Sequence, residues 1–480
     1  MNLLRSISVL GISALLFLFT PSALAQTQPY VPETDPLVIK KLDQWQDWKF
    51  GLLMHWGPYS QWGIVESWSL CSEDVDWCRR PKGSNYVDYV KQYEKLPQTF
   101  NPTAFDPGKW ARAAGDAGMK YVVFTTKHHD GFNMFDTRFS DYKITAVNVP
   151  FHRNRRANVT KEIFDAFRRE NFGIGAYFSK PDWHSDDYWD PFWATPDRNV
   201  NYDTTKHPDK WNRFKDFTYN QINELTTGYG KVDILWLDGG WVRPGIPKDP
   251  VAGSGRVPWP QDIDMPQIAG MARKNQPGII IVDRDVHGPF ENYRTPEQKV
   301  PDAPLPYPWE TCMTMASSWS YVPNDAYKPS RQLIHTLVDV VAKGGNFLLN
   351  IGPSPKGDFA PEAYARLRDI AAWMHINGEA IYNTRPIAPY KQGKIAFTSL
   401  RDGTVFAIYL TDEKEPAPPA TLMIDGIVPA SDAKIKLLGF DKELPWKRTA
   451  KGFSLDIPKE FRNKPIGKFA WTVRISKIIR

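Results

Sequence analysis

The sequence predicts an α/β fold in which a parallel (β/α)8-like barrel of the TIM type precedes a smaller antiparallel β-sandwich. Short apolar runs alternate with amphipathic helical stretches from residue 50 to about residue 385. Polar and aromatic residues stand where the apolar runs end, and the hydrophobic pattern changes to a period of two near residue 388. A chain of 480 residues is also long enough for one large domain and one small domain.

Seven apolar runs are the expected strands of the barrel, and helical patterns lie between them. The expected strands span residues 50–57, 121–130, 173–183, 233–240, 279–285, 308–314 and 346–354. The expected helices span residues 107–118, 159–170, 207–228, 265–275, 329–345 and 361–377. Strands and helices in turn imply parallel strands joined by crossover connections. Because no GxGxxG motif follows the first run, a barrel is favoured over an open nucleotide-binding sheet.

The ends of the predicted strands carry the residues most suited to chemistry. These residues are His55, His128, His129, Trp183, Asp238, Arg284 and Glu310. In a parallel barrel the carboxyl ends of all strands meet at one face, which is the catalytic face. An acid such as Asp238 at the end of an apolar strand is costly unless it is hydrogen-bonded or ion-paired, so we expect these groups to gather around it.

The last part of the chain has a different pattern. The helix at 361–377 begins with proline and is followed by Gly378, and it closes the barrel region. Residues 394–410 then alternate apolar and polar positions about an Asp402-Gly403 turn. We therefore predict a catalytic barrel over residues 26–385 and a β-sandwich domain over residues 386–480.

The N-terminus has the pattern of a secretory signal peptide. Arg5 precedes an apolar run at residues 9–19, and Ala23-Leu24-Ala25 supplies the small-x-small cleavage pattern. We predict a signal peptide over residues 1–25 and an exported chain, periplasmic or secreted, that begins near Gln26. The alternative is an uncleaved anchor, although the run is short for a bilayer and no later segment is apolar for long enough.

Composition excludes several other classes of protein. A hydrophobic content of 42% and a charged content of 24% are those of a folded globular protein. The formal charge of +6 is small for this length and its basic residues are scattered, so we expect no nucleic-acid partner. Of three cysteines, Cys71 and Cys78 are near enough to close a small loop, and Cys312 is expected to be free and buried.

Three kinds of site compete for the strand ends. His55, His128 and His129 with Asp238 have the chemistry of metal ligands, but the pair in HHD lacks the HxH or HxxxH spacing that places two imidazoles on one side. A serine triad lacks its GxSxG elbow. A sugar site fits best, because carboxyl groups stand among histidines, an arginine and many tryptophans. We therefore expect no metal and no cofactor.

Four motifs together resemble the α-L-fucosidase family of retaining glycoside hydrolases. They are FGLLMHWGPYS from residue 50, YVVFTTKHHDGFNMFDTRFSDY from 121, ILWLDGGW from 234 and GGNFLLNIGPSPKGDF from 344. The resemblance is dense over roughly residues 40–385. It implies a catalytic barrel followed by a β-sandwich, and hydrolysis of fucosides without a cofactor.

The resemblance also implies roles for individual residues. Asp238 matches the nucleophile, and Glu297 in the local sequence TPEQ matches the acid/base, with Glu291 as the alternative and Glu310 as a strand-end support. Glu66 and Trp68 occupy the place of an adjacent Glu–Trp pair, although Ser67 separates them here. The implied substrate-binding residues are His55, Glu66, Trp68, His128, His129, Tyr177, Trp236, Arg284 and Trp319.

The activity that follows is exo-acting hydrolysis of terminal α-L-fucose from fucosylated oligosaccharides or glycoconjugates, by double displacement through a covalent fucosyl-enzyme. One alternative is a catalytically silent fucose-binding lectin on the same scaffold, which would have no need of both Asp238 and Glu297. Another is α-L-galactosidase activity beside the first, because an apolar pocket rejects an added hydroxyl only modestly. The sequence leaves the linkage preference and the oligomeric state open.

Overall fold

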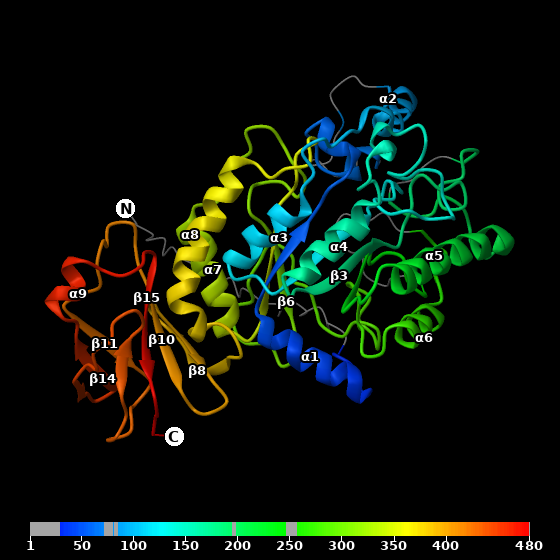
Figure 1. Ribbon diagram of the computed structural model, residues 1–480. Coiled ribbons are helices and arrows are strands. Elements are labelled where there is room, and N and C mark those ends of the chain that lie inside the picture. Colours follow the sequence, from blue (N-terminus) through cyan, green and yellow to red (C-terminus); the bar gives the residue numbers. More distant parts are fainter. Residues whose placement is uncertain (1–28, 72–79, 81–84, 194–197, 246–256, 480) are drawn as a thin grey trace, which may run out of the picture.

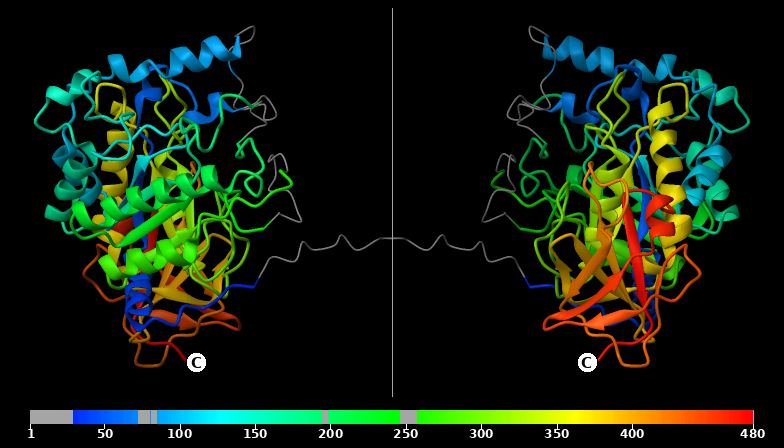
Figure 2. Two further views of the ribbon diagram at one scale, coloured as in Figure 1. Left: turned by 90° about the vertical axis from the view of Figure 1, so that its right-hand side faces the viewer. Right: turned by 90° about the vertical axis from the view of Figure 1, so that its left-hand side faces the viewer.

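The computed structural model describes residues 29–71, 80, 85–193, 198–245 and 257–479. A helix-covered parallel sheet makes up most of the molecule, and two antiparallel sheets lie at one end of it, beyond helices α7 and α8 (Figure 1). Turning the molecule brings those sheets in front of the barrel in the right-hand view of Figure 2. The predicted parallel barrel followed by antiparallel sheets is confirmed.

The parallel sheet has seven strands in the order β5-β4-β3-β2-β1-β7-β6, and all seven predicted strands are present. They are β1 (Phe50–Met54), β2 (Tyr121–Lys127), β3 (Gly173–Ser179), β4 (Ile234–Asp238), β5 (Ile280–Asp283), β6 (Glu310–Thr314) and β7 (Asn346–Asn350). Nearly every strand residue is buried, as expected of parallel strands covered on one face by helices and filled with side chains on the other.

The two edge strands of this sheet, β5 and β6, are joined by residues 284–309, which we call the β5–β6 connection. This connection forms isolated bridges to both edges, Val282 with Glu291 on one side and Arg294 with Trp309 and Glu297 with Cys312 on the other. The place where an ideal barrel has one more strand is therefore filled by irregular chain.

Helices surround the sheet, and most match the prediction. They are α1 (Pro36–Trp48), α2 (Tyr86–Tyr93), α3 (Pro107–Asp116), α4 (Val159–Arg169), α5 (Pro208–Gly228), α6 (Met265–Asn275), α7 (Ser330–Ala342) and α8 (Pro361–Asn377), with 3-10 turns at Pro58–Gln61, Ser67–Leu70, Leu96–Thr99, Pro150–Arg153 and Gly378–Ala380. Side chains cap several starts: Asp106 accepts from the Gly108 amide of α3 at 3.1 Å. The sequence analysis did not identify α1 and α2.

Helix α1 closes the amino-terminal end of the barrel. Its buried Val38, Leu42 and Trp45 join the barrel interior, and Trp45 stacks on Tyr293 with ring centroids 4.1 Å apart. The barrel interior is therefore a packed core that α1 closes at its amino-terminal end.

The remaining strands form two facing antiparallel sheets. One contains β8 (Arg385–Gln392), β9 (Ile395–Ser399), β10 (Val405–Leu410), β12 (Ile435–Leu437) and β15 (Ala470–Ile475), and the other contains β11 (Thr421–Asp425), β13 (Trp446–Arg448) and β14 (Gly452–Asp456), with α9 (Lys459–Asn463) beside them. A buried cluster includes Phe397 and Val473 of the first sheet and Ile424 and Phe453 of the second. This is the packing of a sandwich.

Helix α8 joins the two parts of the molecule. The Trp373 indole donates to the Ala470 carbonyl at 3.0 Å, and Thr472 donates to Asn377 at 2.7 Å. The exact division of the chain at residues 385 and 386 stays a prediction. The predicted signal peptide and Cys78 lie outside the described residues, whereas Cys312 is buried as expected.

One strand-end prediction is wrong. Glu310 is the first residue of β6 and lies in the barrel interior, because pairing of this strand begins only after Pro308.

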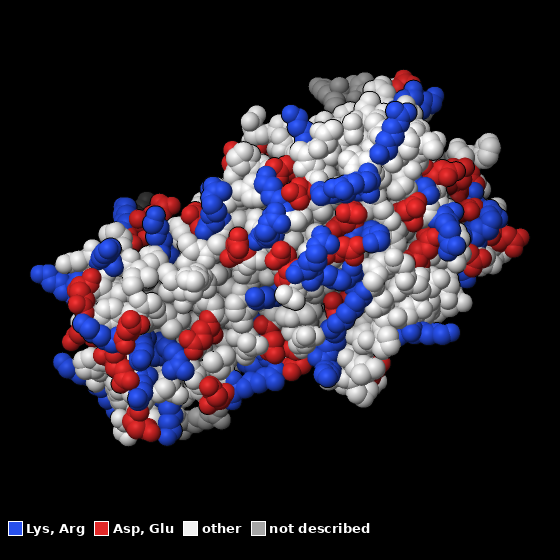
Figure 3. Space-filling view, viewed as in Figure 1, with Lys and Arg blue, Asp and Glu red and all other residues white. Residues whose placement is uncertain are grey.

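In the part of the chain that the structure describes, no helix is long and apolar enough to cross a membrane. Basic and acidic side chains are interspersed over the face seen in Figure 3.

Candidate active site

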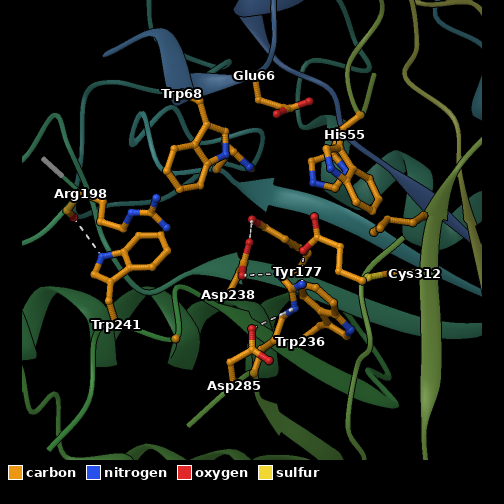
Figure 4. A pocket seen from close by; sticks show the side chains of 16 residues that line it. His55, Glu66, Trp68, Tyr177, Arg198, Trp236, Asp238, Trp241, Asp285 and Cys312 are labelled. Carbon is orange, nitrogen blue, oxygen red and sulfur yellow. Dashed lines mark hydrogen bonds and ion pairs between the residues drawn. The ribbon is translucent and has the colours of Figure 1, made fainter. Parts of the chain in front are cut away.

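A cavity of about 250 Å³ lies at the carboxyl ends of the parallel strands (Figure 4). It brings together most of the predicted site residues, which lie in strands β3 and β4, directly after strands β1, β2 and β5, and in loops. Its lining residues are Leu53, His55, Glu66, Trp68, His128, Tyr177, Arg198, Trp236, Asp238, Gly240, Trp241, Arg284, Asp285, Glu297, Cys312 and Trp319.

Asp238, the last residue of β4, is held by three donors. Its Oδ2 accepts from the Tyr177 hydroxyl at 2.6 Å, and its Oδ1 accepts from the Gly239 amide at 2.8 Å and from Arg284 Nη1 at 3.0 Å. Burial alone would raise the pKa of Asp238, but the charge of Arg284 and the Tyr177 hydrogen bond hold that pKa well below its usual range. The carboxylate is therefore ionised, aimed at the cavity and fixed in direction.

The two glycines after Asp238 let neighbouring chain approach closely. Gly239 has a left-handed φ of 95°, and a side chain there would collide with Pro181. A Cβ on Gly240 would lie 2.8 Å from the Asp285 side chain and 3.0 Å from the Arg284 carbonyl. Gly240 therefore allows the segment that carries Arg284 to lie against the end of β4, and Gly239 allows Pro181, which follows β3, to do the same.

Arg284 links two acids. One terminal nitrogen binds Asp238 and the other binds Glu297, while its Nε donates to the Thr295 hydroxyl at 3.1 Å. Its side chain is 11% exposed, and that of Glu297 is 42% exposed. A single guanidinium therefore sets Asp238 and Glu297 beside each other, one acid on the strand and the other on the β5–β6 connection.

The three predicted histidines all gather near Asp238 and are uncharged. Burial lowers the pKa of His55 to about 4 and that of His129 to about 3, and it lowers the pKa of His128 well below its usual range. His129 Nε2 is 3.8 Å from Asp238, but this histidine does not line the cavity. Neutral imidazoles can both donate to and accept from the hydroxyls of a sugar.

Each histidine ring is held through its Nδ1 atom. The partners of these atoms are Asn350 for His55 at 2.8 Å, Ser67 for His128 at 2.5 Å and Ser179 for His129 at 2.6 Å. Asn350 also donates through Nδ2 to the Trp319 carbonyl at 2.6 Å, so its Oδ1 is the acceptor for His55. The Nε2 atom of His55 is then the acceptor.

Ser67, which sequence reasoning treated as an interruption, has a function in the fold. It begins a 3-10 turn in which its own hydroxyl binds His128, while Glu66 before it and Trp68 after it both line the cavity. Burial raises the pKa of Glu66 to about 8, against the hydrogen bond from the Ser320 amide at 2.8 Å. Glu66 is therefore protonated at neutral pH, unlike Asp238.

Aromatic rings form the floor of the cavity. Trp236 stacks on Tyr177 with centroids 5.2 Å apart, and the Arg284 guanidinium lies 5.2 Å from the Trp236 ring. From below, Glu310 accepts from the Trp236 indole at 3.3 Å and from the Tyr121 hydroxyl at 2.5 Å. Glu310 thus supports Trp236 from the barrel interior.

Glu291 lies outside the cavity. It is buried and accepts from the Asp285 amide at 2.9 Å and binds His287 Nδ1 at 2.8 Å. Asp285 and His287 both have left-handed backbone conformations, with φ of 61° and 57°, which are unfavourable for residues with side chains. Glu291 therefore stabilises the strained turn that follows Arg284.

Several lining residues were not predicted as site residues. Arg198 lies over the rings of Trp68 and Trp241 at 4.6 and 5.1 Å, and it comes from a long loop without a periodic pattern. Asp285 and Cys312 also line the cavity. Only Trp241 had a sequence signal, because it stands three residues after Asp238.

The ligand atoms of His128, His129 and Asp238 lie within 4.8 Å of one another, which is a spacing that metal sites use. The donor set does not fit a cation well, because the Arg284 guanidinium is 3.0 Å from the same carboxylate and carries the same sign of charge as a metal ion. The fit is better for the hydroxyl groups of a neutral ligand.

Comparisons with known proteins agree with this geometry. A family model described as alpha-L-fucosidase matches residues 17–379. Tissue alpha-L-fucosidase of Homo sapiens is 28% identical and aligns over 97% of this chain and 96% of its own length. The solved alpha-L-fucosidase isoenzyme 1 from Paenibacillus thiaminolyticus has a TM-score of 0.73 at 28% identity and covers 92% of this chain and 100% of its own. Thermotoga maritima alpha-fucosidase in complex with a mechanism based inhibitor has a TM-score of 0.71 at 25% identity, covering 94% and 100%.

Proposed function

The chain belongs to the alpha-L-fucosidase family of glycoside hydrolases, and on this premise we propose that it removes terminal α-L-fucose from glycans with retention of configuration. The observation that carries the proposal is the pair of acids on Arg284. Asp238 is kept ionised by the arginine, and Glu297 stands beside it at the mouth of the same cavity. A retaining glycosidase needs two neighbouring carboxyl groups in these positions.

In the first half of the reaction, Asp238 attacks the anomeric carbon of fucose. A bond forms between Oδ and C1 as the bond from C1 to the glycosidic oxygen breaks, and Glu297 gives its proton to that oxygen. The products are a fucosyl ester on Asp238 and a leaving group with a free hydroxyl. The hydrogen bonds from Tyr177 and Gly239 orient the attacking carboxylate.

In the second half, water opens the ester. Glu297, now ionised, accepts a proton from water as the oxygen of that water binds C1, and the carboxylate of Asp238 is released. Two inversions at C1 give net retention. The positive charge of Arg284 stabilises the departing carboxylate and keeps it ionised for the next turnover.

Glu297 is a better acid/base than the other two candidates because of where it lies. Glu291 does not line the cavity, and its oxygens are bound to the Asp285 amide and to His287. Glu66 is protonated and lines the cavity, but it is 1% exposed and held by the Ser320 amide deep in the wall. The acid/base must reach an oxygen outside the sugar ring, and Glu297 is partly exposed at the opening.

The cavity suits a single terminal sugar. It is closed below by Trp236 and the packed barrel interior, and a volume of about 250 Å³ leaves no passage for a continuing chain. Neutral His55 and His128, with protonated Glu66, supply donors and acceptors for sugar hydroxyls, and the ring of Trp319 supplies an apolar surface. We propose that these groups hold fucose.

The proposal is tested by hydrolysis of an aryl α-L-fucoside followed by proton NMR. We expect α-L-fucose to appear before mutarotation, and first release of β-L-fucose would contradict retention. Binding without turnover would support a fucose-binding lectin. An aryl α-L-galactoside tested beside it measures the related activity, which should be weaker because the site must accept an added hydroxyl.

We also propose that the chain is exported, on the basis of the sequence pattern at residues 1–25. N-terminal sequencing of the protein from the medium or periplasm of a secreting host should begin near Gln26. A chain that retains Met1 in exported material would contradict this.

A further inference from the structure

A second cavity adjoins the first on the side of Glu297. Its volume is about 750 Å³, and every residue that lines it belongs to the β5–β6 connection, between Arg284 and Tyr307. Arg284, Asp285 and Glu297 line both cavities. Asp285, at the lower edge of Figure 4, therefore lies where the two cavities meet.

We propose that this second cavity, the connection cavity, binds the leaving group of the substrate, and that this group is a neutral oligosaccharide of at least two sugar residues. The inference rests on the proposed function, because it uses the role of Glu297 as the acid/base. It adds the chemical class of the molecule to which fucose is attached.

The position of Glu297 decides which side the leaving group occupies. An acid that protonates the glycosidic oxygen must contact the atom that joins fucose to the next sugar. With fucose in the first cavity, the next sugar lies beyond Glu297. The space beyond Glu297 is the connection cavity.

The sizes of the two cavities set the length of the leaving group. The connection cavity has about 750 Å³ and the fucose cavity has about 250 Å³, a ratio of 3. Since the smaller cavity accommodates one sugar residue in the proposed function, the larger one has room for more than one. A single sugar would leave most of its surface without contacts.

The charges of the lining favour a neutral molecule. Three basic side chains, Arg284, Arg294 and Lys299, are balanced by three acidic ones, Asp285, Glu297 and Asp302. Arg284 is paired with Asp238 and Glu297, and the charges that remain, Arg294 and Lys299 against Asp285 and Asp302, are also equal in number. No excess charge is left to attract a carboxylated or sulfated sugar.

The remaining groups have the mixture that sugars need. Lys299 is exposed, and its ammonium makes no ion pair or hydrogen bond with any described residue, so it has donors for sugar hydroxyls. Val300 and Leu305 offer apolar surface to the CH faces of a pyranose ring.

The cavity wall is held in place before any ligand binds. Arg294 lies 4.6 Å from the centroid of the Tyr307 ring, and Tyr30 stacks on the same ring at 5.5 Å. His287, on the other wall, is fixed by Glu291 at 2.8 Å. A wall built in advance reduces the ordering cost of binding a flexible glycan.

The test compares substrates in which fucose has the same linkage to one, two or three neutral sugar residues, with an aryl α-L-fucoside as reference. For the unmodified chain we expect kcat/KM to rise by about tenfold from the one-sugar to the three-sugar leaving group, because remote contacts stabilise the transition state. Equal values for all lengths would overturn the inference. So would a higher value for a carboxylated leaving group of the same length.

Two variants locate the effect. Leu305→Trp, which fills the cavity, should remove the rise with length, and Lys299→Ala should lower kcat/KM for the three-sugar substrate by about threefold to tenfold through one lost hydrogen bond. The matched control is Lys391→Ala. This exposed lysine lines a different cavity, beside α7, so the variant should keep the rise of kcat/KM with leaving-group length. A rise that persists in Leu305→Trp would place the leaving group elsewhere.

This failure is distinct from failure of the proposed function. If the unmodified chain does not hydrolyse the aryl fucoside, the proposed function is wrong. If it hydrolyses the aryl fucoside but does not distinguish the lengths of the leaving groups, only the connection cavity has been misassigned.

Discussion

The strand wall of the barrel and the β5–β6 connection meet at the same cavity but are built differently. The wall, strands β1 to β4, carries Asp238 as the last residue of β4, and the buried His55 and His128 directly follow the ends of β1 and β2. The connection carries Glu297 on irregular chain that pairs with the sheet through isolated bridges, and the Glu297 side chain is 42% exposed.

This difference separates two tasks. In the proposed function, the wall holds the terminal sugar and the nucleophile Asp238 in fixed directions, as regular strands do. The connection carries the proposed acid/base and the whole lining of the second cavity. Arg284 joins them, because it is the first residue of the connection and binds an acid from each side.

The largest effect should come from the wall. Asp238→Gly should lower turnover on every substrate by at least about 10⁴-fold, because neither half of the reaction proceeds without the nucleophile. Azide should restore slow turnover and give β-fucosyl azide, which NMR identifies. Asp441→Gly, at an exposed aspartate that lines neither cavity, is the matched control and should keep the activity. If Asp238→Gly kept its activity, Asp238 would not be the nucleophile and the proposed mechanism would be wrong.

Replacing Glu297, the proposed acid/base on the β5–β6 connection, should cause a loss of activity that depends on the leaving group. Glu297→Ala should lose on the order of 10²–10⁴-fold on sugar leaving groups and much less on an aryl group of low pKa. Azide should then give α-fucosyl azide, because it attacks the fucosyl ester. Equal losses on both kinds of substrate would show that Glu297 is not the acid.

Glu291 should affect the connection as a positioning residue. Glu291→Ala should lower kcat/KM by about tenfold, because two hydrogen bonds to a buried charged acceptor are lost at the turn that holds Arg284. The loss should be equal on aryl and sugar substrates, and Glu291→Gln should recover part of it. A loss confined to sugar leaving groups would make Glu291 the acid/base.

Ionisation of Glu66, which lies in the cavity wall, should set the alkaline limit of kcat/KM. With a pKa of about 8, it ionises above that pH and places a negative charge near Asp238 and Glu297. We expect kcat/KM for the aryl fucoside, which needs little acid catalysis, to fall above about pH 8. The fall should be absent in Glu66→Gln. An unchanged alkaline limb in that variant would assign it to another group.

The raised pKa of Glu66 and the lowered pKa of His55 also make the free energy of unfolding depend on pH, in opposite directions. A raised carboxyl pKa means that the native state binds the proton more tightly, so the contribution of Glu66 to the free energy of unfolding falls as pH rises from about 4.5 to about 8. The lowered pKa of His55 makes its contribution fall as pH drops from about 6.5 to about 4. Urea unfolding of Glu66→Gln should therefore show a smaller fall in the free energy of unfolding between about pH 4.5 and about pH 8.

The smallest effect should be that of chelation. Prolonged treatment with a strong chelator should change kcat/KM by less than about twofold, because Arg284 occupies the place of a cation beside Asp238. Loss of activity that zinc restores would instead assign a metal to His128, His129 and Asp238.

The sequence by itself determined the barrel, its seven strands and the residues at the end of each wall strand. Period and length mark a strand, and parallel topology then brings the residue after each strand to one face, so His55, His128 and Asp238 had to meet. The motif around Asp238 also indicated its neighbours Trp236 and Trp241.

Only the tertiary structure decided where the residues of the connection lie. It placed Glu291 beneath a strained turn, Glu297 on Arg284 and Glu310 under Trp236, and it gave Ser67 a partner in His128. These positions depend on contacts between residues far apart in an irregular chain, where no periodicity relates sequence distance to direction. The same physical reason places Arg198 over Trp68, because a long loop is positioned by what it packs against.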